Sequence, residues 1–189
     1  MRKARLISLC LLLVLSVAII GYGVYAASTV NMSANGTIAF ISNDVKADIE
    51  CYVGSDSGTA SKTVTFTKND ESNSWAPTLS FDTNTVRSNP ANNATFTKQL
   101  SFKIRNKTSK PVYAYFTNTS GEITNDTLNT SSSKNINVTL SGKTTIEVSG
   151  VQTLTITFTI PSTNNKFTRD ETANFAYRLV LSSFDPALV

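Results

Sequence analysis

The sequence predicts an all-β fold in which two antiparallel sheets pack as a β-sandwich of Ig-like or jelly-roll type. Apolar residues recur at every second position, most clearly in 153–160, where Thr alternates with Leu, Ile and Phe. Such a segment can bury one face in a sheet and leave the other in water. β-branched Thr, Val and Ile dominate the apolar runs, which disfavours helices. Asn, Gly, Ser and Pro separate the runs at short intervals, as expected of turns.

The same alternation predicts about ten short strands in chain order. The stretches 54–61 and 68–74 are rich in Ser, Asn and Asp and are expected to be loops. The longer polar stretch 118–135 is expected to be a loop with at most a short strand around Ile123. The strands are expected at 36–41, 45–53, 62–67, 78–82, 100–105, 112–117, 136–141, 144–149, 153–160 and 175–181.

One change of phase sets the first strand apart from the second. Ile38 and Phe40 are even-numbered, whereas the apolar positions from Ile41 and Val45 onward are odd-numbered. Turn residues lie between the two runs, so 36–41 is predicted to be a separate strand or one side of a bulge. A strand so close to the start of the folded region could pair within its own sheet or with the edge of another copy.

The N-terminus has the pattern of a secretory signal peptide that forms a helix ahead of the sandwich. Three basic residues in 1–5 precede an apolar run at 6–20, and Val24 and Ala26 fit a cleavage site after Ala26. An uncleaved anchor is the alternative, because 6–26 is long enough to span a bilayer. The expected organisation is therefore a signal peptide at 1–26, a short leader at 27–35 and a sandwich domain at 36–189.

The export signal carries most of the positive charge. The chain has 17 Lys and Arg against 13 Asp and Glu, a formal charge of +4. Removal of Arg2, Lys3 and Arg5 leaves 14 basic against 13 acidic residues, so the mature domain is nearly neutral. Its lysines are scattered rather than clustered with aromatic residues, and no nucleic-acid partner is expected.

The residue inventory argues against catalysis. The chain has no histidine, which excludes a Ser-His-Asp triad and a His-ligated metal. The one cysteine of the mature domain, Cys51, falls on the buried parity of its strand and is expected to be an inert small hydrophobe. The carboxylates lie in loops or point outward from strands, without an acid–base pair. A non-enzymatic protein without metal or cofactor is expected.

Exposed aromatic side chains could stack on a carbohydrate. Trp75, Tyr113 and Tyr115 are the candidates, because the two tyrosines take the parity opposite Val112 and Phe116. In the alternative interpretation, a loop covers the tyrosine face and Trp75 belongs to the core.

A small-residue processing site, a short strand soon after it and a domain rich in Thr and Asn occur together in this chain. The segment FKIRNKTSKPVYAYFTN (102–118) has the order strand, Asn, turn, strand. In these features the chain resembles the TasA/camelysin-type secreted matrix proteins of Gram-positive bacteria. It departs from them at the processing region, where Ala-Ala-Ser-Thr-Val replaces an aromatic-Ser-Asp segment. The resemblance implies an extracellular fibre or biofilm-matrix subunit whose N-terminal strand inserts into a neighbour.

The sequence therefore predicts a secreted or cell-surface structural or adhesive protein that forms a homopolymer. In that hypothesis Ile38 and Phe40 fill grooves of the next copy while backbone hydrogen bonds give affinity. The alternative is an extracellular binding module that contacts a glycan or a surface protein. Contact with a membrane is expected only through 6–26, if that segment is not cleaved.

Overall fold

The computed structural model describes residues 32–68, 71–81, 95–118, 121–130, 134–161 and 170–185. These residues belong to one unit, Asn31–Val189. The expected signal peptide, the cleavage site at Ala26 and the leader up to residue 31 lie outside the described residues. In the described part of the chain there is no helix, and so none that could cross a membrane.

The described residues form two sheets of six strands each, which confirms the all-β prediction. In sheet A the order is β10-β7-β12-β1-β4, and β5 pairs with β1 beside β4. In sheet B the order is β3-β2-β6-β11-β9-β8. The bounds in sheet A are β10 (Thr144–Ile146), β7 (Val112–Thr117), β12 (Glu171–Ser182), β1 (Met32–Asn43), β4 (Ser72–Trp75) and β5 (Thr78–Phe81). Those in sheet B are β3 (Lys62–Phe66), β2 (Ala47–Val53), β6 (Phe96–Asn106), β11 (Val151–Ile160), β9 (Asn135–Leu140) and β8 (Asn125–Asn129).

Aromatic side chains join the apolar faces of the two sheets in one core. The Phe102 ring of sheet B meets Phe40 and Phe116 of sheet A edge to face, with centroids 6.1 and 5.6 Å apart. Phe158 of sheet B lies 4.9 Å from Phe175 of sheet A. Edge-to-face pairs at these distances add to the free energy gained by burial alone. The arrangement is sandwich-like, and the choice between an Ig-like and a jelly-roll topology stays a prediction.

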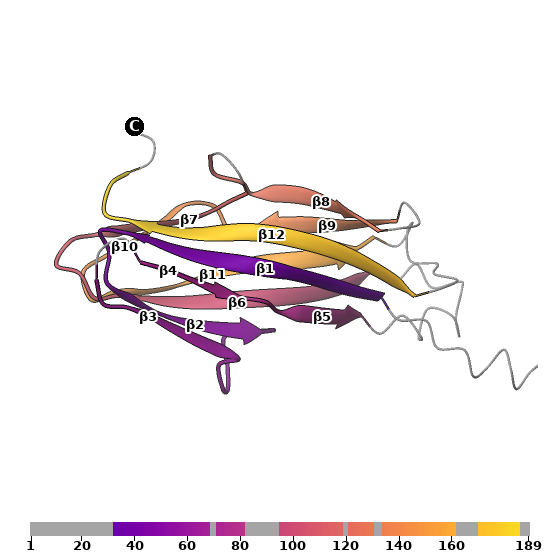
Figure 1. Ribbon diagram of the computed structural model, residues 1–189, viewed down its shortest axis with the longest axis horizontal. Coiled ribbons are helices and arrows are strands. Elements are labelled where there is room, and N and C mark those ends of the chain that lie inside the picture. Colours follow the sequence, from indigo (N-terminus) through magenta and orange to yellow (C-terminus); the bar gives the residue numbers. More distant parts are fainter. Residues whose placement is uncertain are drawn as a thin grey trace, which may run out of the picture. The chain divides into compact units, whose positions relative to one another are not determined.

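The prediction of purely antiparallel sheets is wrong at one place, because β1 runs parallel to β12. The register extends from Met32 opposite Glu171 to Asn43 opposite Ser182 (Figure 1). On its other side β1 pairs antiparallel with β5 and then with β4. The first strand is therefore an interior strand of sheet A rather than an edge strand. A hairpin cannot produce a parallel pair, so this contact depends on the course of the whole chain.

β1 begins at Met32, four residues before the predicted start of the first strand. Ile38 and Phe40 point into the core, and residues 44–46 then carry the chain across to β2 in sheet B. The two parities seen in the sequence thus belong to two strands in different sheets, except that Ile41 lies on β1 and points outward. The prediction that the first strand is separate from 45–53 is confirmed.

Two strands fall where the sequence predicts loops. β4 has the sequence SNSW and β8 the sequence NDTLN, and neither shows a clear apolar alternation. β4 is fixed by pairing with β1, and β8 by pairing with β9 at the edge of sheet B. Pairing with a neighbour rather than hydrophobic periodicity determines these short edge strands.

Gly36 makes room for an aromatic ring between the sheets. It lies opposite Phe175 in the parallel register, and a Cβ at this position would overlap with the backbone oxygen and the ring of Phe175. The Phe175 ring in turn stacks on Tyr177, with centroids 5.8 Å apart. The absence of a side chain at Gly36 is thus a requirement of the pairing between β1 and β12.

Substitution of Gly36 by Val should therefore destabilise the domain by about 2–3 kcal/mol, because overpacking forces the backbone or the Phe175 ring to move. Chemical denaturation of residues 27–189 measures the change. Gly142→Ala is the matched control, because a Cβ at Gly142 would make only ordinary contacts of 3.6 Å or more. Equal stability of the two variants would contradict the close fit at Gly36.

Candidate functional site

The two candidate assembly residues, Ile38 and Phe40, lie in the core of their own chain. Both are 0% exposed. Ile38 lies opposite Trp75 of β4, and the ring of Phe40 packs on Phe102. Here Ile38 and Phe40 thus pack within their own chain and not in the grooves of a neighbouring copy. Any assembly through Ile38 and Phe40 requires β1 to leave this position.

The structure does not bring the three candidate aromatic residues together. Trp75 lies on the inner side of β4, half-buried, with its ring edge to face on Phe102 at 6.1 Å. Tyr113 and Tyr115 lie on β7, which is separated from β4 by two strands, and they point to the outer face of sheet A. Trp75 therefore packs against the core, as in the alternative interpretation of the sequence.

The two tyrosines form part of a partly apolar stretch on the outer face of sheet A. Tyr115 lies opposite Val180, and Val180 lies opposite Ile41. Val180 is only 5% exposed although it points outward, so its neighbours cover it. The ammonium group of Lys143 lies 6.0 Å from the centre of the Tyr113 ring and is held by Asp185 at 2.8 Å. Its hydrogen bond to Asp185 is the main reason why the pKa of Lys143 is raised.

Cys51 and Tyr177 are reactive groups that lie buried in the fold. Cys51 is buried, as the sequence predicts, and burial raises the pKa of its thiol to about 12, which keeps the reactive thiolate scarce. The Tyr177 hydroxyl donates to Asp126 at 2.7 Å and so ties sheet A to the β8 edge of sheet B. Burial, and then this hydrogen bond, raises the pKa of Tyr177. No cluster of three or more Cys, Asp or Glu suited to a metal occurs in the described ranges.

The structure reveals a polar hollow at one end of the two sheets, which we call the end hollow. It has a volume of about 390 Å³, and none of the side chains around it is apolar. Three segments form it: the linker between β1 and β2, the loop between β6 and β7, and the residue directly after β12. Its lining residues are Asp44, Lys46, Lys107, Thr108, Ser109, Lys110 and Ser183.

Backbone hydrogen bonds join the three segments around the end hollow. The amide of Lys107 donates to the carbonyl oxygen of Lys46 at 2.9 Å, which links the β6–β7 loop to the linker. The amide of Ser183 donates to the carbonyl oxygen of Asn43 at 3.3 Å. The Ser183 hydroxyl also donates to Oδ2 of Asp44 at 3.3 Å. These hydrogen bonds therefore hold the backbones of the three segments that carry the lining residues.

One of the three lysines is partly neutralised. The ammonium group of Lys107 lies 2.6 Å from Oδ2 of Asp48. Burial would raise the pKa of Asp48, but hydrogen bonds from Lys107 and Thr65 outweigh it and hold this pKa below its usual value. Among the described residues no carboxylate forms an ion pair with Lys46 or Lys110. The end hollow therefore has an excess of positive charge.

Asn106 determines the shape of the loop that carries two of these lysines. Its amide nitrogen donates to the carbonyl oxygens of Lys110, Ile146 and Glu147 at 2.8, 3.0 and 3.1 Å. Its Oδ1 accepts from the amide and the hydroxyl of Thr108 at 2.8 and 2.6 Å. Asn106 is only 1% exposed, so these bonds replace the water that its amide would otherwise bind. One side chain thus fixes two neighbouring loops.

Sequence reasoning missed the end hollow because its lining comes from three distant segments. The local signal is Asn-Lys-Thr-Ser-Lys at 106–110, where two lysines occur in one short turn. Nothing in that turn indicates that Lys46 and Ser183 lie beside it. The charge also looks scattered along the chain, because the tertiary structure alone brings these lysines together.

No model of a known protein family and no curated protein matches the sequence. The likeness of 102–118 to TasA/camelysin-type proteins therefore stays a resemblance.

Replacement of Asn106 by Ala should destabilise the domain by about 2–4 kcal/mol, because three carbonyl oxygens and the Thr108 amide lose a buried partner. Thermal or chemical denaturation measures the loss, and amide NMR signals of 107–110 should broaden or shift most. Asn137→Ala on the exposed face of β9 is the control and should change stability by no more than about 0.5 kcal/mol. Similar losses in both variants would contradict the anchoring role of Asn106.

Proposed function

We propose that this chain is an exported, non-enzymatic structural or adhesive protein of the cell surface or extracellular matrix, and that its copies associate by exchanging β1. The export pattern of residues 1–26 supports the location. The absence of histidine and the inert surroundings of Cys51 and Tyr177 support a role without catalysis. The position of β1 supports the mode of association.

The observation that carries the proposal is that β1 is the first strand of the described chain and makes a large share of the core. It pairs along its full length with β12 and supplies Met32, Ile38 and Phe40 to the core. Among the described residues only the linker 44–46 continues the chain from β1 to the rest of the sheets. A β1 from a second copy could make the same contacts, which is the condition for exchange of identical elements.

The attachment of β1 restricts the geometry of such an exchange. β1 is joined to its own β2 at the end that carries the end hollow. If an exchanged β1 keeps its parallel register with β12, its linker must lie at that same end of the receiving copy. The two copies then meet at equivalent ends and can exchange strands reciprocally, which gives a closed pair. Longer fibres then need a contact other than this exchange.

A cross-strand disulfide distinguishes exchange from association through other surfaces. Ala39 of β1 lies opposite Ser74 of β4, and both point away from the core. In the variant A39C/S74C of residues 27–189, exchange should place the two cysteines of each bond on different chains. Oxidation of associated material should then give covalent dimers on a non-reducing gel. The thiol of Cys51 should not interfere, because it is buried in the core and burial raises its pKa.

The matched control is T139C/T157C, which joins β9 to β11 within sheet B. This pair should close within one chain in both monomeric and associated protein. Covalent dimers from A39C/S74C but not from the control support exchange of β1. Associated protein in which A39C/S74C closes only within single chains, or protein that stays monomeric at high concentration, would overturn the proposal.

A second candidate function is glycan binding, which the shared outward face of Tyr113 and Tyr115 favours. Two aromatic rings on one exposed face could stack on sugar rings. In that case Tyr113→Ala and Tyr115→Ala should each weaken binding on a glycan array by about tenfold. The control Thr145→Ala changes an exposed neighbour opposite Tyr113 and should bind like the wild type. Binding that survives both tyrosine substitutions would exclude this face.

A further inference from the structure

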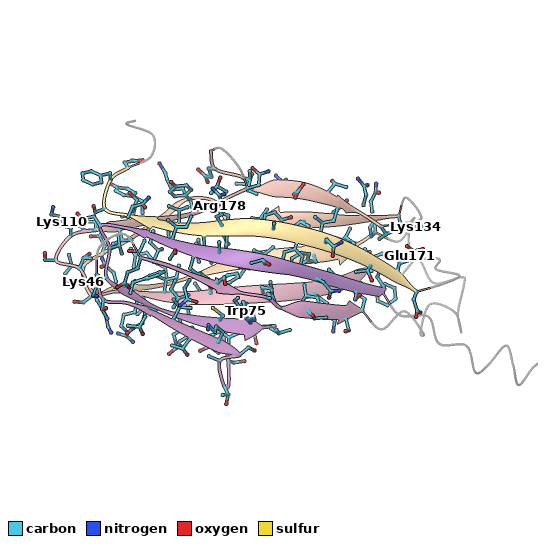
Figure 2. The ribbon with its side chains drawn as sticks, in the orientation of Figure 1. Lys46, Trp75, Lys110, Lys134, Glu171 and Arg178 are labelled. Atoms are coloured by element: carbon cyan, nitrogen blue, oxygen red, sulfur yellow. The ribbon has the colours of Figure 1, made fainter. Side chains whose placement is uncertain are left out.

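We propose that the end hollow is a binding site for an anionic sugar. Its lysines hold a phosphate or carboxylate group of the sugar, and Asp44 accepts a hydrogen bond from a sugar hydroxyl. This inference goes beyond the proposed function, because it does not depend on whether β1 is exchanged. Figure 2 shows Lys46 and Lys110 at the same end of the two sheets, whereas Lys134 and Glu171 lie at the other end. The site is argued from its charge, its donors and its size.

The charge of the end hollow favours an anion. Lys46 and Lys110 have no carboxylate partner among the described residues, whereas Lys107 is shared with Asp48. The positive charge of Lys46 and Lys110 beside the end hollow is thus not balanced by an ion pair, and an oxyanion bound there would balance it. Ammonium groups also form shorter and stronger hydrogen bonds to charged oxygens than to neutral ones. A phosphate or carboxylate is therefore the group that this lining fits best.

The hydrogen-bonding groups of the lining indicate how a ligand would lie. The hydroxyl of Thr108 is already occupied by Asn106 and by the carbonyl oxygen of Lys110. The hydroxyl of Ser109 makes no such bond among the described residues and can donate to a ligand. Asp44 is the one carboxylate in the lining. A carboxylate only accepts hydrogen bonds, so Asp44 needs a donor group on the ligand. A ligand that carries both an oxyanion and hydroxyl groups satisfies the lysines and Asp44 together.

The size and rigidity of the end hollow fit a small molecule. Its volume of about 390 Å³ lies at the lower end of the range of roughly 300–1,000 Å³ that is usual for ligand pockets. Asn106 and the bond between Lys107 and Lys46 already hold the loop and the linker in place. The lysine backbones are thus ordered before binding, which lowers the entropic cost of holding a ligand.

Amide NMR titration of ¹⁵N-labelled residues 27–189 tests the site. The probes are glucose 6-phosphate, glucuronate, inorganic phosphate and uncharged glucose. Both charged sugars should shift the amide signals of 44–46, 107–110 and Ser183 in a saturable manner, whereas glucose should not. The charged sugar that binds with the higher affinity shows whether phosphate or carboxylate is the preferred group. Inorganic phosphate should bind more weakly than glucose 6-phosphate, because it offers no sugar hydroxyls to Asp44.

Two double variants with the same net charge separate a site from general attraction. K46Q/K110Q should weaken binding of the better charged sugar at least about tenfold, since it removes two charge-assisted contacts. K98Q/K134Q changes two lysines away from the end hollow and should bind like the wild type. Asp44→Asn should strengthen binding of inorganic phosphate, because a nearby negative charge is lost. Thermal denaturation of each variant shows that the fold is retained.

Three results would overturn the proposal. The first is the absence of saturable shifts with both charged sugars up to millimolar concentration. The second is equal weakening by the two double variants, which would indicate attraction to the whole positive surface. The third is binding of glucose as strong as that of glucose 6-phosphate, which would exclude recognition of the anion. None of these results bears on the exchange of β1, which the disulfide experiment tests separately.

Discussion

The parallel pairing of β1 with β12 joins segments that are 139 residues apart in the chain. Sheet A is complete only when both strands are in place, because β4 and β5 pair with β1 and with no other strand of the described residues. The contact is possible only because Gly36 leaves room for Phe175. Contacts between such distant segments form slowly, since the loop between them must close first. Until then the edge of β12 that faces β1 stays unpaired, and in the proposed exchange a β1 from another copy pairs with it.

A second constraint lies at the end of the sheets where β1 continues into β2. Asn106 uses its whole amide to hold two loops, and backbone bonds tie the β6–β7 loop to the linker. The same bonds that keep the linker closed also arrange the lysines of the end hollow. A ligand between Lys46 and Lys110 would bridge the linker and the loop.

The sequence predicted strands well where one face is buried and the other is wet. In β11, Thr alternates with Leu, Ile and Phe, so only one face of the strand can pack its apolar side chains into the core. Prediction failed for β4 and β8, which are polar and depend on their neighbours for pairing. It left Trp75 open, because an isolated sequence cannot assign this residue to the core or to the surface. The sequence could not predict the end hollow, because Lys46, Lys110 and Ser183 come from three segments that are distant in the chain.

The sequence by itself determined the all-β class of the fold, the burial of Cys51 and the buried parity of the long strands apart from the end of β2, where Tyr52 is buried and Val53 exposed. These properties follow from local periodicity and composition, which each segment carries regardless of its neighbours. Only the tertiary structure decided that β1 lies inside sheet A, parallel to the last strand, and that lysines gather at one end. Those properties are set by which strands become neighbours, and the choice depends on packing across the core. The absence of a side chain at Gly36 matters only because the tertiary structure places the ring of Phe175 beside it.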